Sequence, residues 1–321
     1  MKRRSILQAG AAAPWLTSAQ AQETAYPNKP IKLVVPYPAG GVVDIIARTV
    51  AEKMSIALKQ PIVVEARPGA NANIGAEAVA RSPADGYTLL MVSPFLATNP
   101  LLAQGTRWKA ADFIAIGLIG APPNIFVVPA SLPVRSLKEL VDYARARPGK
   151  LNVSNPGIGT SNHLGQELFF SVTGIDMVDV NYKGQPPMLA DFFSGQISFG
   201  LVTQALAAPH IKHGKLRALA IGASKRSPDL PDVPTAAEAG YAEAAFLPWF
   251  GIAAPAGVPR DIVRRLSDEL QKALAASDAA ARLERMGTQI TPASAEEFDA
   301  LIQREIVRWA RVIRERNIKA D

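Results

Sequence analysis

Two glycine-rich segments carry residues that could bind a small anion. The first spans 36–44, reads Pro-Tyr-Pro-Ala-Gly-Gly-Val-Val-Asp, and lies between an apolar β-branched run and a helical pattern. A helix that starts directly after a strand presents unpaired N–H groups and a partial positive charge to an anion. Glycines at 40 and 41 let a ligand approach the backbone closely. The pattern itself points to Gly40 and Gly41, and to Asp44 at the start of the helix.

The second segment, 154–163, has the same strand-loop-helix character and is richer in hydroxyl groups. It reads Ser-Asn-Pro-Gly-Ile-Gly-Thr-Ser-Asn-His. Asn162 stands where a dinucleotide fingerprint needs its third glycine, and no Gly-Lys-Ser or Gly-Lys-Thr follows as in a P-loop. A neutral anion site without lysine favours a carboxylate over a polyphosphate. The pattern itself points to the hydroxyl groups of Ser154, Thr160 and Ser161, and to His163 two residues further on.

Structural alternatives exist for both segments. The first could be a plain tight turn, with Asp44 capping the following helix through its backbone N–H groups. His163 could act as a general base or pack within its own loop. His210 and His213 have a metal-binding spacing but lack a clear third ligand. Trp249 and Phe250, in a predicted strand, are expected in the core rather than against a ligand.

Composition excludes several kinds of chemistry. The 321 residues contain no Cys and three His, so we expect no disulfide, thiolate catalysis, metal site or cofactor. No Gly-x-Ser-x-Gly motif or carboxylate pair indicates a hydrolase or an acid–base enzyme. The sequence therefore favours a binding protein over an enzyme.

The N-terminus has the pattern of a secretory signal peptide. Basic residues 2–4 precede the apolar run 6–16, and Ala19-Gln20-Ala21 fits a small-x-small cleavage site. We predict a signal peptide over 1–21, cleaved after Ala21, with Sec or twin-arginine export left open. Its removal changes the formal charge from +7 to +4, because 1–21 contains three basic residues and no acid. Basic residues alternate with acidic ones, so no nucleic-acid partner is expected, whereas a mild positive charge suits a small anion.

Length and periodicity indicate two α/β domains. Short apolar strands alternate with helical periods, which predicts a mostly parallel sheet. The predicted strands are 31–35, 62–65, 87–92, 114–119, 125–128, 151–154, 177–181, 197–202, 216–221 and 246–253. The predicted helices are 44–58, 74–80, 161–172, 187–193 and one after Ser136, followed by two C-terminal helices marked by apolar stripes over 262–270 and 298–313. Pro122-Pro123 is the expected crossing between domains, and Ser136/Glu139 and Ser294/Glu297 are expected capping boxes.

Several blocks of the chain resemble one family of periplasmic receptors. They are YPNKPIKLVVPYPAGGVVDIIAR (26–48), ARPGANANIGAEAVARSPADGYTLLM (66–91), GIGTSNHLGQELF (157–169), YKGQPPMLADFFSGQI (182–197) and LPDVPTAAEAG (230–240). In this order they resemble the Bug family, the periplasmic receptors of tripartite tricarboxylate transporters. The resemblance implies a type II periplasmic-binding-protein fold with two α/β lobes, a hinge and an interlobe ligand cleft.

The resemblance also implies domain limits, a site and partners. We expect lobe 1 to contain 22–123 and the return segment 246–321, and lobe 2 to contain 124–245. It implies that the two glycine-rich segments hold a ligand carboxylate from opposite lobes, with Ser93 in the wall. Carried over by position, the residues on one side are Tyr37, Ala39, Gly40, Gly41 and Asp44, and those on the other are Ser154, Gly159, Thr160, Ser161 and His163. The partners implied are a small carboxylate and the membrane subunits of the transporter, for a receptor expected to be monomeric and periplasmic.

The chain departs from the family pattern at two places. Many relatives have an acidic residue followed by Asn where this chain has Val202 and Thr203. An acid there could pair with a ligand ammonium, so its absence favours a non-amino mono- or dicarboxylate, and Thr203 joins the candidate ligand-binding residues. Asn155-Pro156 is unusual in a loop that is rich in Ser elsewhere in the family. A receptor feeding a signalling partner and a carboxylate-acting enzyme on the same scaffold are the alternatives.

Overall fold

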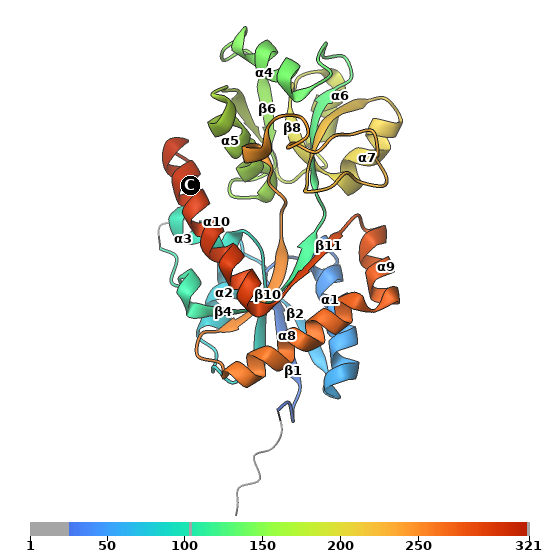
Figure 1. The fold of residues 1–321 in the computed structure, drawn as a ribbon. Helices are drawn as coiled ribbons and strands as arrows, with labels where there is room; N and C mark the ends of the chain where they lie inside the picture. The colour runs from blue at the N-terminus through green and yellow to red at the C-terminus, as the bar shows by residue number, and fades with distance from the viewer. Residues whose placement is uncertain (1–25, 103–104, 320–321) are drawn as a thin grey trace, which may run out of the picture.

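The computed structural model describes residues 26–102 and 105–319; the signal peptide predicted over 1–21 lies outside them. Figure 1 shows two lobes connected by extended segments of chain. The lower lobe is built on a six-stranded sheet, and the upper lobe on a three-stranded and a two-stranded sheet. The two-lobed α/β architecture agrees with the sequence-based prediction.

The six-stranded sheet is mixed rather than mostly parallel. In spatial order its strands are β11 (Gln289–Ala293), β4 (Phe113–Ala121), β10 (Phe250–Pro255), β3 (Thr88–Val92), β1 (Ile31–Val35) and β2 (Ile62–Ala66). β1 pairs in parallel with β2 and β3, whereas β10 is antiparallel to β3 and β4, and β11 is antiparallel to β4. The prediction of a mostly parallel sheet is wrong because β10 returns from the other lobe and enters the sheet in the opposite direction.

Helices cover both faces of this sheet. One face packs against α1 (Val42–Leu58), α8 (Arg260–Ala275) and α9 (Ser277–Arg285). The other packs against α2 (Asn73–Ala80), α3 (Phe95–Leu102) and α10 (Ala295–Glu315), with the 3-10 turn η1 (Ala110–Asp112) nearby. Leu33 and Val35 point to the first layer and Val34 to the second, so both faces of β1 are buried. This double burial explains the uninterrupted apolar run in the sequence.

The upper lobe has its own sheets and core. β5 (Asn124–Pro129) lies between β8 (Gly200–Thr203) and β9 (Leu216–Gly222) and is antiparallel to both. β6 (Asn152–Asn155) is parallel to β7 (Val178–Asn181). The surrounding helices are α4 (Leu137–Arg145), α5 (Ser161–Thr173), α6 (Met188–Ser194) and α7 (Gln204–Lys212), with the 3-10 turn η2 (Ala242–Ala244). In the core, the rings of four residues pack against one another in edge-on or tilted arrangements, with centroid distances of 5.4 to 6.3 Å; they are Phe126, Phe169, Phe170 and Phe199.

The chain crosses between the lobes twice, and α10 contacts both. β4 leaves the lower sheet and continues through Pro122-Pro123 into β5, and β10 brings the chain back. α10 packs on β4 and α3, while Trp309 near its end packs against Leu164 and Leu168 of α5. We propose that 22–123 and 246–321 form lobe 1 and 124–245 forms lobe 2.

Three elements were missed by the sequence analysis because each contains a proline. They are α3 with Pro100, α7 with Pro209 and β11 with Pro292. α9 was missed as well. Both capping serines do cap: Ser136 accepts the Glu139 N–H, and Ser294 forms the full reciprocal box with Glu297. The Glu139 carboxylate accepts the N–H of Arg135 instead of the N–H of Ser136, so the reciprocal half of the first capping box is not formed.

We expect Gly251→Ala to lower the free energy of unfolding by about 1–3 kcal/mol. A Cβ there would lie 2.4 Å from two ring atoms of Phe298 and 2.7 Å from the Gly117 carbonyl oxygen, which would push α10 away from β10. Urea denaturation should show that Phe298→Leu offsets part of this loss, because the shorter side chain opens space. Strictly additive effects in the double variant would contradict the contact.

Candidate functional site

A cavity of about 160 Å³ lies between the two lobes, where several strands end. Its walls come from the segments that follow β1, β2 and β3 in the lower lobe and β6 in the upper lobe, together with the segment entering β10. In open α/β sheets, ligands bind outside the carboxyl ends of the strands. The lining residues are Tyr37, Val43, Asn71, Ser93, Pro94, Phe95, Gly159, Thr160, Ser161, Pro248 and Phe250.

Neutral hydroxyl groups form the lower wall. The Tyr37 hydroxyl lies 2.8 Å from Ser93 Oγ, and its ring meets Phe95 edge-on at a centroid distance of 6.4 Å. Burial raises the pKa of Tyr37 to about 12, although the hydrogen bond with Ser93 works in the opposite direction. Tyr37 therefore stays protonated at neutral pH and offers the cavity a neutral donor on an apolar ring.

A second element of the lower wall is Asn71, in the turn after β2. Ala70, Asn71 and Ala72 all have positive φ, a conformation that non-glycine residues rarely adopt. The Asn71 Nδ2 donates to Asn99 Oδ1 at 3.1 Å, and the Asn99 amide donates back to the Asn71 carbonyl at 2.6 Å. This reciprocal pair holds the turn in place at the edge of the cavity.

The upper wall is the N-terminus of α5. Thr160 is its N-cap: Oγ1 accepts the His163 N–H at 3.4 Å and donates to the Gly157 carbonyl at 2.7 Å. The Ser161 hydroxyl has no hydrogen-bond partner among residues 26–102 and 105–319 and lines the cavity. The first amides of a helix have no partner within it, so this wall presents N–H groups as well as a hydroxyl.

The N-terminus of α1 lies at the same cavity from the opposite lobe. Gly41 is the N-cap of this helix, and Val43, two residues further on, lines the cavity. Two helix N-termini, one from each lobe, therefore border one small space. Their partial positive charges favour an anion there without any cationic side chain.

Other candidates from the first segment lie beside the cavity and do not line it. Ala39, Gly40 and Gly41 form the exposed loop before α1. The Gly40 N–H donates to Asp44 Oδ2 at 3.0 Å, and Arg48 Nε donates to the same oxygen at 2.9 Å. The Arg48 hydrogen bond lowers the pKa of Asp44, so this buried carboxylate stays ionised and holds the loop against α1.

Three candidates linked to the second segment also point elsewhere. Ser154 is fully buried at the end of β6, beneath Gly200. Thr203 donates to Gln185 Oε1 through both its N–H (2.9 Å) and its hydroxyl (3.0 Å). His163 is 4% exposed and accepts the Gly159 N–H on Nδ1 at 3.3 Å. It lines a separate hollow behind α5, as expected if it packs within its loop.

The sequence analysis did not select several lining residues. These are Val43, Asn71, Pro94, Phe95, Pro248 and Phe250. Asn71 lies within the block 66–91, in a glycine- and asparagine-rich turn that follows a predicted strand. That turn is the sequence pattern from which Asn71 could have been predicted. Phe250 was expected in the core but lines the cavity, whereas its neighbour Trp249 is indeed buried against Phe298.

None of the described residues that line this cavity is charged. Larger hollows border the loop 224–229 and the start of α8, but the small cavity lies at the strand ends and at both helix N-termini. Backbone amides, hydroxyl groups and apolar rings can hold a small anion with an apolar body. They supply no nucleophile with an adjacent base.

Comparison with known proteins identifies the family of the chain. Residues 46–318 match the model of the tripartite tricarboxylate transporter family receptor. The chain belongs to this family. It is 36% identical to BugT of Bordetella pertussis over 317 residues, covering 98% of this chain and 95% of BugT. The structure of the periplasmic binding protein BugD superposes with a TM-score of 0.74 at 31% identity, covering 92% of this chain and all of BugD. The structure of Rpa4515 from R. palustris with adipate superposes with a TM-score of 0.76 at 34% identity, covering 92% of this chain and 99% of Rpa4515.

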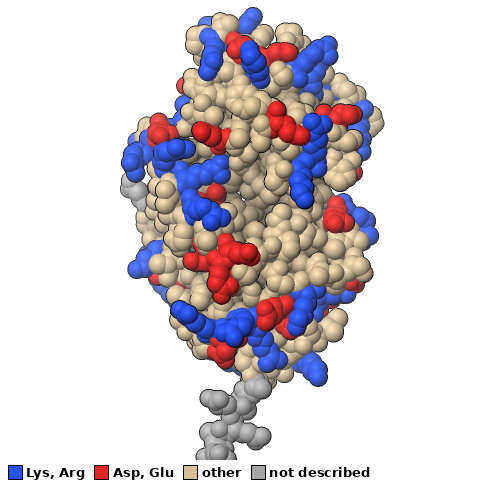
Figure 2. Space-filling model, in the orientation of Figure 1, with Lys and Arg blue, Asp and Glu red and all other residues tan. Residues whose placement is uncertain are grey.

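The protein is thus a Bug-type periplasmic solute-binding receptor and not an enzyme. Within the described residues, no helix combines the length and apolar character needed to cross a bilayer. Figure 2 shows acidic and basic side chains interspersed over one face of the receptor rather than gathered by sign.

We expect Thr160→Ala to lower the free energy of unfolding of the receptor by about 1 kcal/mol, because it removes the N-cap of α5. Ser161→Ala is the matched control, since its hydroxyl bonds to no described residue, and should leave stability unchanged. Guanidinium denaturation of the two variants measures the difference. Equal stability of both would contradict the capping role of Thr160.

The raised pKa of Tyr37 predicts an unusual alkaline titration. At pH 11, about a tenth of this tyrosine should be ionised, against about nine tenths of an ordinary one. The difference in 295 nm absorbance between wild type and Tyr37→Phe should therefore rise only near pH 12. Because the unfolded chain ionises first, Tyr37 should lower stability as pH rises from 10 towards 12. A midpoint near pH 10 would contradict the burial of the hydroxyl.

Proposed function

We propose that this receptor captures a small non-amino carboxylate between its lobes and delivers it to the membrane subunits of a tripartite tricarboxylate transporter. The observation that carries the proposal is the pair of helix N-termini, α1 and α5, that border one uncharged cavity. They supply N–H donors for a carboxylate, with Ser93, Thr160 and Ser161 as neighbouring hydroxyl groups. Adipate in the related R. palustris structure supports a carboxylate as the ligand class.

The preference for a non-amino ligand rests on the cavity lining. No Asp or Glu lines it, so a ligand ammonium would be buried without an opposite charge. Val202 and Thr203, from which the sequence analysis argued the same point, do not line the cavity; Val202 is fully buried in the core of the upper lobe. The absence of an acid at those two positions therefore gives no support to the preference for a non-amino ligand.

The apolar part of the lining indicates what the ligand body contacts. Tyr37, Phe95 and Phe250 offer ring surface, and Val43 and Pro248 add aliphatic surface. An aliphatic or aromatic mono- or dicarboxylate would place its carboxylate at the helix N-termini and its carbon atoms against these rings. In this proposal Ala39, Gly40, Gly41, Asp44, Ser154, His163 and Thr203 shape the two loops around the ligand.

The remaining parts of the proposal concern the whole molecule. We propose that a signal peptide is removed after Ala21 and that the mature receptor is a periplasmic monomer. Ligand binding would draw the two lobes together about the strands that connect them, and the closed form would dock on the membrane subunits.

The test compares succinate with aspartate, which differ by one ammonium group. Calorimetric titration of the mature chain, unfolded and refolded to remove carried ligand, should show succinate or adipate binding and aspartate at least tenfold weaker. Phosphate is the control for a general anion. Aspartate binding as tightly as succinate would overturn the non-amino preference, and no heat with any carboxylate would overturn the carboxylate function.

The Ser161 hydroxyl provides the matched variant. Hydrogen bonds to a charged group contribute about 1.5–3 kcal/mol. Ser161→Ala should therefore lower the affinity for the tightest-binding carboxylate at least about tenfold. Its folding stability should stay unchanged, as argued above. Ser171→Ala, on the opposite end of α5 and bonded to Glu315, controls for an unspecific effect of losing a serine. Unchanged affinity in Ser161→Ala would remove α5 from the site.

A further inference from the structure

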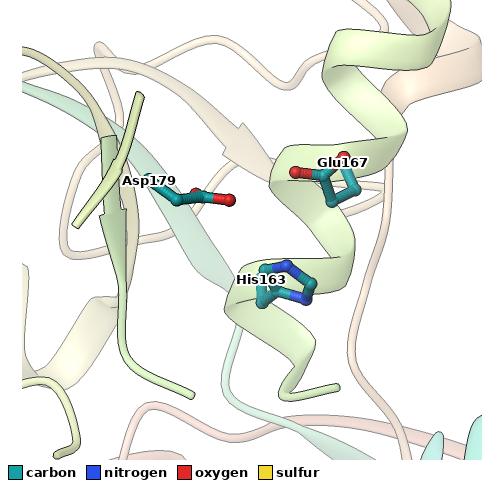
Figure 3. Close-up of side chains that lie close together, drawn as sticks. All are labelled: His163, Glu167 and Asp179. Carbon is teal, nitrogen blue, oxygen red and sulfur yellow. The ribbon is translucent and has the colours of Figure 1, made fainter. Parts of the chain in front are cut away.

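A cluster of three potential metal ligands lies behind α5, outside the interlobe cavity. His163 and Glu167 are one turn apart on the same face of α5, and Asp179 faces them from β7 (Figure 3). One donor atom from each residue lies within 4.8 Å of the other two. The sequence analysis predicted no metal site, because Asp179 is brought to the histidine only by the pairing of β7 with β6.

The donor atoms in this cluster are incompletely used. His163 is 4% exposed and engages Nδ1 with the Gly159 N–H, so Nε2 has no partner in the described part of the chain. Figure 3 shows a ring nitrogen facing the two carboxylates. Glu167, 5% exposed, uses Oε2 for Arg316 Nε at 2.8 Å, which leaves Oε1. The Asp179 carboxylate forms no hydrogen bond or ion pair with a described residue.

The charge balance of the cluster also favours a cation. Three carboxylates, Glu167, Asp176 and Asp179, line one hollow of about 380 Å³ together with Arg316 and Lys319. Arg316 bonds to Glu167 and Asp176 and not to Asp179. Arg316 and Lys319 therefore face three carboxylates, so the described residues that line this hollow include one more acidic side chain than basic ones.

We propose that His163, Glu167 and Asp179 form a binding site for a divalent transition-metal ion, with Zn²⁺ as the best match. One imidazole nitrogen and two carboxylate oxygens suit zinc better than Ca²⁺ or Mg²⁺, which prefer oxygen ligands alone. Donors around tetrahedral zinc lie about 3.4 Å apart. The three donor atoms here lie within 4.8 Å of one another and the Asp179 side chain is exposed, so metal binding would draw them together through side-chain rotation. The adjoining hollow leaves room for water as the fourth ligand.

Occupation of this site would act on the ligand loop. Zinc on Nε2 places the ring proton on Nδ1, because a neutral imidazole carries one proton. Nδ1 then no longer accepts the Gly159 N–H. Gly159 lines the interlobe cavity, so the metal would release an amide beside the bound anion and tie β7 to the start of α5.

The test uses Zn²⁺ alone and does not depend on the carboxylate ligand. The mature chain, without an affinity tag and dialysed against EDTA, is titrated with Zn²⁺ by calorimetry. We expect one saturable equivalent, at least tenfold weaker in Asp179→Asn, whose exposed side chain is not needed for folding. Asp142→Asn is the matched control from an exposed carboxylate of the same lobe, paired only with Lys138, and should bind as wild type does.

Two results would overturn the inference. The first is a wild-type chain that shows no saturable one-to-one binding. The second is Asp179→Asn binding like wild type while the double variant His210→Asn/His213→Asn loses Zn²⁺, which would place the metal at the end of α7. Cobalt gives an independent measurement, because its visible absorption should intensify on binding to a four-coordinate site in wild type and stay at the weak level of hydrated Co²⁺ in Asp179→Asn.

Discussion

The first amides of an α-helix have no hydrogen-bond partner within the helix, and this constraint organises the receptor. α1 and α5 begin directly after strands β1 and β6, so their N-termini lie at the same end as the carboxyl ends of those strands. The two lobes bring both N-termini to one cavity. In the proposed function, a small anion between them would satisfy amides from each lobe, so lobe closure and ligand binding would be coupled.

A cavity without charged side chains suits a receptor that must also release its ligand. Amides and hydroxyl groups bind an anion as neutral hydrogen-bond donors. A buried Arg or Lys would instead bring a full positive charge, and burying that charge has a large desolvation cost. Asp44, in the helix beside the cavity, is paired with Arg48 and accepts the Gly40 N–H, which holds the first loop against α1. The protein places full charges in the supporting layer and leaves the wall neutral.

α10 links the lobes by a route separate from the two crossing strands. Its first half packs on β4 and α3, and its last turns pack on α5, where Arg316 bonds to Glu167 and Asp176. Arg308 adds bonds to the carbonyl groups of Glu243 and Ala245 before β10. α5 therefore contacts the ligand cavity at its N-terminus and α10 along its length. A change in the angle between the lobes must be accommodated at this contact.

The sequence by itself determined the lobed α/β fold, the family and the two loops that meet at the cavity. These are local properties, because β-branched runs form strands, capping serines start helices, and glycine-rich turns between them expose amides. It placed Tyr37, Ser93, Gly159, Thr160 and Ser161 in the site, and all five line the cavity. Only the tertiary structure decided which neighbours of these residues line the same cavity. Phe250 enters because β10 is antiparallel to β3, which puts the start of β10 at the same end of the sheet as the carboxyl ends of β1, β2 and β3, and Asn71 enters from the turn after β2. His163 faces away because a helix turns successive side chains by about 100°.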